Sequence, residues 1–248
     1  MTLQDFFAQN PKLALAFSGG TDSAYLLYAA AKSGADVTAY YVKTPFQPQF
    51  ELDDAQRLVR QLGAKMRILP LDILQDAQIT ANPRNRCYFC KKKIFSAILQ
   101  AAEADGYTVI ADGTNASDDA NDRPGMQALR ELSVRSPLRE CGLTKAEVRA
   151  RSREAGLFTW DKPAYACLAT RIACEEPITA QKLQTTEQAE TALFRMGFRD
   201  FRVRMAGDRA TIQIPSAQFA LLFAQREAIL KELKPLYHAV LLDLEGRT

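Results

Sequence analysis

A glycine-rich hexapeptide near the N-terminus limits the possible folds more than any other feature of the sequence. Residues 18–23 read Ser-Gly-Gly-Thr-Asp-Ser and directly follow the apolar run 13–17. Apolar side chains then recur at helical spacing over residues 21–32, before Gly34. The sequence therefore predicts a strand, a tight loop and a helix, in the order in which an α/β fold begins.

The alternation of strands and helices continues along the chain. Further strands are predicted at residues 36–42, 66–71 and 108–111, and helices at 51–62 and 90–104. Another helix is expected at Thr144-Lys145-Ala146-Glu147, which has the reciprocal capping pattern of a helix start. This alternation is typical of a parallel sheet covered by helices, so the expected fold class is α/β.

A change of pattern after Pro177 indicates a second, smaller domain. This part is predicted to contain helices over residues 180–196 and 216–233, a hairpin of strands 201–205 and 209–214, and a last strand at 239–244. We therefore expect an α/β domain over residues 1–171 and an α+β domain over residues 178–248.

Charge, apolar runs and cysteine content exclude several classes of protein. The formal net charge of +3 is too small to indicate nucleic-acid binding. The sequence has no run of about 18 apolar residues and no pattern of an export signal, so we expect a cytoplasmic protein that spans no membrane. The five cysteines of such a protein are expected to be free, metal-bound or reactive rather than paired in disulfides.

The hexapeptide has the chemistry of an anion site. Gly19 and Gly20 allow the backbone to approach a ligand closely, and the following helix directs its N–H groups toward the same point. Asp22 is suited to hold Mg²⁺ beside a polyphosphate. Hydroxyl groups are supplied by Ser18, Thr21 and Ser23. A glycine turn with a Ser/Thr helix cap would explain the glycines alone, but the complete strand–loop–helix context favours phosphate binding.

These residues resemble the SGGxDS signature of the PP-loop ATP pyrophosphatases, which include NAD synthetase, argininosuccinate synthetase, the synthetase half of asparagine synthetase and tRNA thiolases. Members typically cleave ATP between the α and β phosphates and pass AMP to a carboxylate or carbonyl oxygen. Nitrogen or sulfur then displaces the AMP. The resemblance implies ATP and Mg²⁺ as ligands of residues 18–23, with Asp22 and Ser23 in catalytic roles, and it leaves the nucleophile open.

Five further motifs narrow the resemblance. They are Asn82-Pro83-Arg84-Asn85-Arg86-Cys87-Tyr88-Phe89-Cys90-Lys91, Ala111-Asp112-Gly113-Thr114-Asn115, Arg123-Pro124-Gly125, Ser136-Pro137-Leu138 and Trp160-Asp161-Lys162-Pro163-Ala164-Tyr165-Ala166-Cys167-Leu168-Ala169-Thr170-Arg171. In this order they resemble the LarE family of sulfur transferases over nearly the entire chain. That family matures the nickel-pincer cofactor of lactate racemase. The resemblance implies that the chain adenylates a carboxylate of a pyridinium biscarboxylate mononucleotide, replaces AMP with sulfur, and forms a ring-like homo-oligomer.

Three cysteines are candidates for the sulfur step. Cys167 matches the family's sulfur-donating cysteine, whose sacrificial form gives up its sulfur and becomes dehydroalanine. Cys87 and Cys90 are three residues apart, so a helix would place both sulfurs on one face. With Cys167 they could bind a [4Fe–4S] cluster that leaves one iron free for exogenous sulfide. A zinc clip or ordinary thiols would also explain the pair, and a buried apolar cysteine would explain Cys167.

The last cysteine of the chain marks a departure from the family. Residues Ala173-Cys174-Glu175-Glu176 stand where family members commonly continue with a Pro-Tyr-Gly-like turn. Cys174 could carry a persulfide, supply a fourth ligand or simply occupy a loop. Cys141 is assigned no role.

Other residues are candidates for binding ATP and metal. Gly113, Thr114 and Asn115 follow a predicted strand, whose carboxyl end should lie beside the first loop and line the ATP site. Four nearby carboxylates could assist Mg²⁺, with Asp118 preferred: Asp112, Asp118, Asp119 and Asp122.

Two arginines in the second domain are candidates for the substrate's phosphate. Arg202 and Arg204 are two residues apart on a predicted strand and so point to one face. Solvated arginines on an edge strand would explain them equally well, whereas the resemblance implies that they bind the phosphate of the mononucleotide. Glu190 occupies the corresponding acidic position on the preceding helix, with a divalent ion or an arginine as its partner.

Three alternatives to the sulfur transferase remain open. A tRNA thiolase uses the same ATP loop, although the small net charge gives little support for RNA binding. An ammonia ligase would not require the cysteines, and a non-catalytic nucleotide-binding module would not require the intact set of Ser18, Asp22, Ser23 and Cys167. We therefore expect a small-molecule carboxylate substrate and neither nucleic acid nor membrane as a partner.

Overall fold

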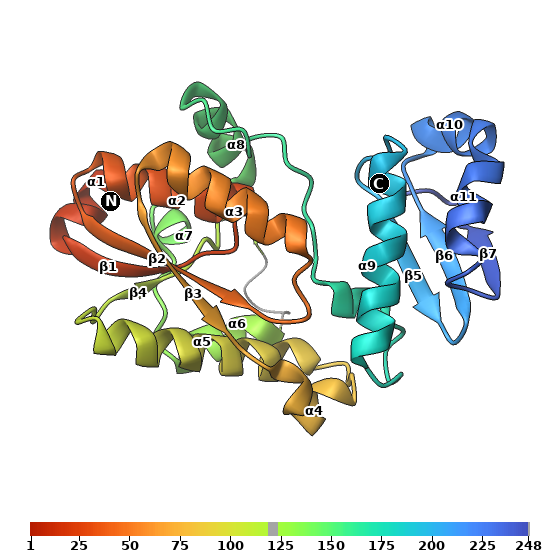
Figure 1. The fold of residues 1–248 in the computed structure, drawn as a ribbon. Coiled ribbons are helices and arrows are strands. Elements are labelled where there is room, and N and C mark those ends of the chain that lie inside the picture. The colour runs from red at the N-terminus through yellow and green to blue at the C-terminus, as the bar shows by residue number, and fades with distance from the viewer. Residues whose placement is uncertain (119–123, 248) are drawn as a thin grey trace. The chain divides into compact units, whose positions relative to one another are not determined.

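The computed structural model describes residues 1–118 and 124–247. The chain forms two compact units, each built from several segments (Figure 1). The first unit consists of Met1–Thr44, Gln49–Asp72 and Asn85–Lys162, and the second of Pro45–Pro48, Ile73–Arg84 and Pro163–Thr248.

The first unit contains a parallel sheet of four strands in the order β3-β2-β1-β4. The strands are β1 (Lys12–Ala16), β2 (Asp36–Lys43), β3 (Lys65–Pro70) and β4 (Ile110–Ala111). The helices of this unit are α1 (Leu3–Gln9), α2 (Thr21–Lys32), α3 (Gln49–Leu62), α5 (Arg86–Ala104), α6 (Pro124–Glu131), α7 (Pro137–Glu140) and α8 (Lys145–Glu154). The predicted helix-covered parallel sheet and the α/β class are confirmed.

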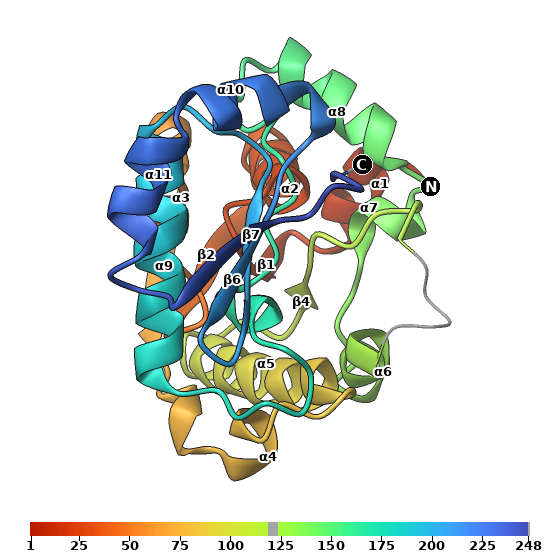
Figure 2. The same ribbon diagram turned by 90° about the vertical axis from the view of Figure 1, so that its right-hand side faces the viewer.

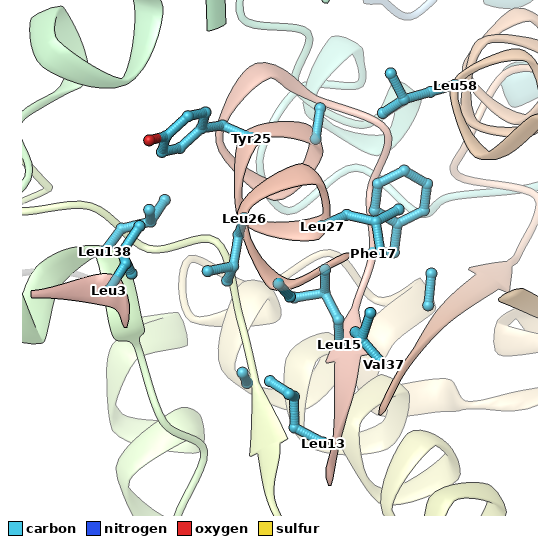
Figure 3. Packing of buried hydrophobic residues seen from close by; sticks show 14 of the residues in the cluster. Leu3, Leu13, Leu15, Phe17, Tyr25, Leu26, Leu27, Val37, Leu58 and Leu138 are labelled. Carbon is cyan, nitrogen blue, oxygen red and sulfur yellow. The ribbon is translucent and has the colours of Figure 1, made fainter. Parts of the chain in front are cut away.

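Side chains of β1 point alternately into two cores, one on each face of the sheet. Leu13 and Leu15 pack with residues of α2 and α3, whereas Ala14 packs with residues of α5 and α6. Figure 3 shows Leu15 beneath Leu26 and Leu27 of α2, with Leu58 of α3 beside them. Because both faces are covered, β1 must be apolar from Leu13 to Ala16, and this is why the run before the glycine loop is continuous rather than alternating.

The second unit contains a mixed sheet of three strands. β5 (Arg202–Ala206) pairs antiparallel with β6 (Arg209–Gln213), which pairs parallel with β7 (Ala239–Leu242). The remaining elements are the 3₁₀ turns η1 (Ile73–Gln75), η2 (Leu168–Arg171) and η3 (Ser216–Gln218), and the helices α4 (Ala77–Thr80), α9 (Ala180–Arg195), α10 (Phe219–Ala224) and α11 (Arg226–Leu233). Figure 2 shows α9 and α11 beside this sheet. The predicted hairpin is confirmed, with Gly207 at φ 57° in its turn.

Some element boundaries differ from those predicted. The helix expected from residue 90 begins at Arg86, so Cys87 lies inside its first turn. Helix α1 has no counterpart among the predictions, although Thr2 and Asp5 form a complete capping box at its start. The capping box of Thr144 and Glu147 at α8 is confirmed.

Among the helices of residues 1–118 and 124–247, none is long and apolar enough to cross a membrane.

Truncating the core beneath the glycine loop should destabilise the first unit. Leu15 is fully buried, so Leu15→Ala is expected to lower the free energy of unfolding by about 2–5 kcal/mol. The single tryptophan, Trp160, lies in this unit and reports urea unfolding by fluorescence. Ile68→Ala, at a β3 side chain that is 38% exposed, is the control and should cost less than about 1 kcal/mol. Equal losses in the two variants would contradict this account of the core.

Candidate active site

The candidate site lies at the carboxyl ends of β1 and β4. The chain leaves β1 through residues 18–20 into α2 and leaves β4 through residues 112–115. β1 has β2 on one side and β4 on the other, so the order of strands reverses at this point. In open α/β sheets, ligands bind outside the carboxyl ends of strands where such a reversal occurs.

Two glycines shape the loop after β1. Gly19 has φ +73°, and a Cβ atom there would lie 3.1 Å from the Cβ of Ala55 on α3. Gly20 is the N-cap of α2, and no side chain caps the helix at this position. The first N–H groups of a helix have no partner within it, so the start of α2 presents them to an anion.

The hydroxyl groups of the loop have different partners. Ser18 Oγ and Ser23 Oγ lie 3.0 Å apart, and the N–H of Gly20 donates to Ser18 Oγ at 3.3 Å. These contacts hold the turn closed around the start of α2. Thr21 Oγ1 instead donates to the carbonyl oxygen of Thr159 at 2.8 Å and is buried. Its hydroxyl therefore fixes α2 to the segment before Trp160.

Asp22 forms an ion pair with a lysine that is distant in sequence. Lys145 Nζ lies 2.5 Å from Asp22 Oδ2. Lys145 is the first residue of α8, directly after the N-cap Thr144, and its N–H donates to Ser117 Oγ at 3.0 Å. No motif predicts this contact, since the capping pattern reports where a helix starts and not where its side chains reach. The ammonium group adds positive charge beside the loop.

The other oxygen of Asp22 fits a magnesium ligand. Within the described part of the chain, Asp22 Oδ1 is buried and has no hydrogen-bond partner. A buried carboxylate oxygen without a partner is costly unless a cation or donor binds it. Mg²⁺ usually takes one or two protein carboxylates together with substrate phosphates. Asp22 is therefore the residue that would hold Mg²⁺, and the ion would neutralise negative charge on bound phosphates.

The loop after β4 lies directly against the start of α2. A Cβ atom on Gly113 would stand 2.8 Å from the backbone nitrogen of Ser23. Such a distance is too short for any real contact, so only glycine fits here. The loop after β4 was predicted to lie beside the loop after β1, and the structure brings the two together by direct contact of their backbones.

Nearby carboxylates shape the second loop. Asp112 is buried and accepts hydrogen bonds from Thr114 Oγ1 at 2.5 Å and Ser136 Oγ at 2.7 Å. Asp118 Oδ2 accepts from the N–H of Asn115, which is also buried, at 3.0 Å. Both carboxylates therefore hold the backbone of residues 112–118. Asp119, Asp122 and Arg123 lie outside the described residues.

Cys87 and Cys90 lie one turn apart at the start of α5. Cys87 is exposed and Cys90 is half-buried, while the neighbouring Arg86 is buried. Among the residues that the structure describes, no group of three or more His, Cys, Asp or Glu side chains is placed to hold a metal ion. Cys167 belongs to the second unit and these two cysteines to the first. The [4Fe–4S] assignment therefore stays a prediction.

In the second unit, Cys167 precedes η2 beside a buried ion pair. Arg171 Nε lies 2.8 Å from Glu190 Oε1, and both side chains are almost completely buried. The hydroxyl of Tyr165 donates to Glu190, and the N–H of Val203 donates to the same carboxylate at 2.9 Å. Burial and the charge of Glu190 raise the pKa of Tyr165, which keeps its hydroxyl protonated as a donor. Of the two partners predicted for Glu190, a divalent ion or an arginine, the structure shows an arginine, Arg171.

Arg202 and Arg204 differ strongly in exposure. Arg202 is 4% exposed and donates to the carbonyl oxygens of Phe201 and Ala164. Arg204 is exposed and donates to the carbonyl oxygen of Thr170 at 2.5 Å. Burial, with the charges of Arg171 and Arg247, lowers the pKa of Arg202 to about 10, so it remains charged at neutral pH.

Comparisons with known proteins show which family this chain belongs to. The family model described as "Queuosine biosynthesis protein QueC" matches residues 12–93, which include the glycine loop. Uncharacterized protein slr1717 of Synechocystis sp. is 37% identical over 98% of this chain and 92% of its own length. The pyridinium-3,5-bisthiocarboxylic acid mononucleotide synthase of Lactiplantibacillus plantarum is 32% identical over 95% of this chain and 86% of its own length. The chain belongs to the PP-loop ATP pyrophosphatase family.

Members of the PP-loop ATP pyrophosphatase family are adenylating, ATP-dependent enzymes, and this part of the prediction is confirmed. Homology to the synthase extends along nearly the whole chain. The tRNA-specific 2-thiouridylase MnmA of Thermobifida fusca is 29% identical, but over 60% of this chain and 50% of its own length.

Gly113→Ala should weaken ATP binding, because the new Cβ forces the loop away from the start of α2. Overpacking typically costs about 1–3 kcal/mol, which predicts a fall in affinity of about tenfold, measured by titration calorimetry with ATP and Mg²⁺. Gly34→Ala is the matched control. Gly34 has φ +81° in open space, so this change should lower stability by about 1 kcal/mol and leave ATP affinity unchanged. The same affinity in both variants would exclude Gly113 from the site.

Proposed function

We propose that the chain is an ATP-dependent sulfur transferase that converts a carboxylate of a pyridinium biscarboxylate mononucleotide into a thiocarboxylate, in nickel-pincer cofactor biosynthesis. The L. plantarum homologue, which aligns with 95% of the chain, is named as a synthase of the pyridinium bisthiocarboxylic acid mononucleotide, and this name supports the proposed substrate. The observation that carries the chemistry is the loop at the start of α2, where Asp22 Oδ1 is buried without a hydrogen-bond partner in the described structure.

The first step in this proposal is adenylation. The N–H groups at the start of α2, with Lys145, hold the phosphates of ATP and stabilise the charge that develops on the leaving group. A carboxylate oxygen of the substrate attacks the α-phosphorus, and the bond to the β-phosphate oxygen breaks to release pyrophosphate. A carboxylate is a poor electrophile, whereas its mixed anhydride with AMP has a good leaving group.

The second step is sulfur transfer. In this proposal the thiolate of Cys167 attacks the acyl carbon, and AMP leaves with the carboxylate oxygen that had attacked phosphorus. A base then removes the Cα proton of Cys167, the Cβ–S bond breaks, and the thiocarboxylate leaves with the sulfur and its electron pair. Dehydroalanine remains at position 167. Exogenous sulfide delivered by a cluster on Cys87, Cys90 and Cys167 is the alternative source of sulfur.

The charge around the Cys167 segment supports an anionic substrate. In the second unit, the positive charges of Arg171 and Arg247 act on both Arg202 and Arg204. The acidic groups that act on Arg202 are Glu190 and Asp200, so positive charge is in excess. Of the proposed phosphate ligands, Arg204 presents the exposed guanidinium group.

A tRNA thiolase is the second candidate function, because MnmA enzymes share part of the sequence. The similarity covers half of the T. fusca protein. The net charge of +3 also gives little support for a surface that binds tRNA. Release of pyrophosphate stimulated by tRNA, and not by the mononucleotide, would favour this alternative.

The two chemical steps should respond differently to two substitutions. Asp22→Asn should reduce pyrophosphate release by at least about a hundredfold, since the loop loses its carboxylate. Cys167→Ser should retain pyrophosphate release and lose thiocarboxylate formation, measured by mass spectrometry. Cys141→Ser, at a half-buried thiol outside both sites, is the control and should retain both. Thiocarboxylate formation by Cys167→Ser would exclude the proposed role of Cys167.

The source of sulfur can be determined on protein purified without oxygen. The cluster hypothesis predicts iron, acid-labile sulfide and a visible absorption band that Cys87→Ala abolishes. A colourless protein in which Cys167 loses mass as product forms would instead assign the sulfur to Cys167 itself.

A further inference from the structure

Three arginines bind the backbone of the segment that carries Cys167. Arg202 donates to the carbonyl oxygen of Ala164. Arg171 Nη1 donates to that of Ala166 at 2.7 Å, and lies 3.4 Å from that of Cys167. Arg204 Nη1 donates to the carbonyl oxygen of Thr170 at 2.5 Å. We call these three residues the arginine clamp.

The clamp supplies hydrogen-bond donors to carbonyl oxygens of this segment, as the N–H groups of neighbouring turns or strands do in regular secondary structure. Between Pro163 and Cys167 the chain forms neither helix nor strand, and η2 supplies a single turn from Leu168 to Arg171. Carbonyl oxygens in such a segment need donors from side chains or water. Guanidinium groups suit this task, because each carries five N–H donors in a rigid plane.

The arginines of the clamp are themselves fixed in place. Arg171 is paired with the buried Glu190 of α9. The ring of Tyr165 lies 4.4 Å from the guanidinium of Arg171 and 5.2 Å from that of Arg202. Arg204 Nε donates to Gln213 Oε1 of β6 at 2.9 Å. The segment is thus attached to α9 and to the β5–β6 hairpin, which share one apolar core.

Arg202 is poorly placed to bind a ligand directly. Its side chain is 4% exposed, and its two terminal nitrogens donate to the carbonyl oxygens of Phe201 and Ala164. Because so little of this side chain is exposed, contact with a phosphate would require the segment that covers it to move.

We propose that the arginine clamp is a positioning device that holds Cys167 for sulfur transfer, and that Arg202 acts through the backbone of this segment rather than on the substrate's phosphate. This inference rests on the proposed function. The clamp does not touch the reacting atoms: it fixes the backbone from which the Cys167 thiol attacks. Small displacements of a reacting group can lower a rate by about a hundredfold.

Kinetics of Arg202→Met and Arg202→Lys separate positioning from phosphate binding. Positioning predicts that Arg202→Met lowers the maximal single-turnover rate of thiocarboxylate formation by about tenfold or more, with a smaller effect on pyrophosphate release. The substrate concentration at half-maximal rate should change less than about threefold, and lysine should restore part of the rate. Arg226→Met, at an exposed arginine of the same unit, is the control and should behave as wild type.

The opposite kinetic result would overturn the inference. A direct phosphate contact predicts that the half-maximal concentration rises while the maximal rate is retained. Should Arg202→Met lower the melting temperature so far that it cannot be assayed, Tyr165→Phe removes one donor to Glu190 and so loosens the ion pair that anchors Arg171, without removing any arginine. It should show the same lowered maximal rate, and an unchanged maximal rate in Tyr165→Phe would contradict the clamp.

Hydrogen exchange tests the clamp without depending on activity. Amides of residues 164–171 should exchange about tenfold faster in Arg202→Met and Arg171→Lys than in wild type, while those of α11 should not change. If the wild-type protein forms no thiocarboxylate but the two variants show this loss of protection, the proposed function is disproved and the clamp is retained as a structural feature of the segment. Unchanged exchange would disprove the clamp alone.

Discussion

The close contact between Gly113 and the start of α2 is the constraint on which the candidate site depends. It places the loop after β4 against the first helical turn after β1, at the point where the strand order reverses. The two-sided core fixes β1 beneath this contact, because Leu15 and Ala14 pack on opposite faces of the sheet. The N–H groups of α2 and the carboxylate of Asp22 are therefore held on a backbone frame that packing fixes, and such rigidity lowers the entropy cost of binding phosphates.

The two units solve the problem of buried charge in different ways. In the first unit, the ion pair with Lys145 satisfies Asp22 Oδ2, while Oδ1 is left without a hydrogen-bond partner in the described part. This incomplete satisfaction favours a cation at the loop. In the second unit, Glu190 accepts hydrogen bonds from Arg171, Tyr165 and the backbone of Val203. A carboxylate whose oxygens both have donors holds a structure together, whereas one with an oxygen that lacks a donor is suited to bind a cation.

Local chemistry could be predicted from the sequence, and long-range contacts could not. The Ser-Gly-Gly-Thr-Asp-Ser loop, the capping box of Thr144 and the hairpin at Gly207 all depend on residues within a few positions of one another. Lys145 reaches Asp22 across 123 positions, and no periodic pattern reports such a contact. The alternation on β5 predicted that Arg202 and Arg204 point to one face, but it did not reveal that Arg202 is buried whereas Arg204 is exposed. That difference comes from the irregular segment at residues 164–170, which covers Arg202 and uses its donors.

The central claim is that ATP is used to place AMP on a carboxylate oxygen that sulfur later displaces. The most direct test uses a substrate whose carboxylates carry oxygen-18, followed by mass spectrometry of the AMP released with the thiocarboxylate product. Attack by the carboxylate on the α-phosphorus predicts AMP that contains one labelled oxygen, because that oxygen leaves with phosphorus when sulfur attacks the acyl carbon. Unlabelled AMP from a reaction that does form the thiocarboxylate would contradict the adenylation mechanism.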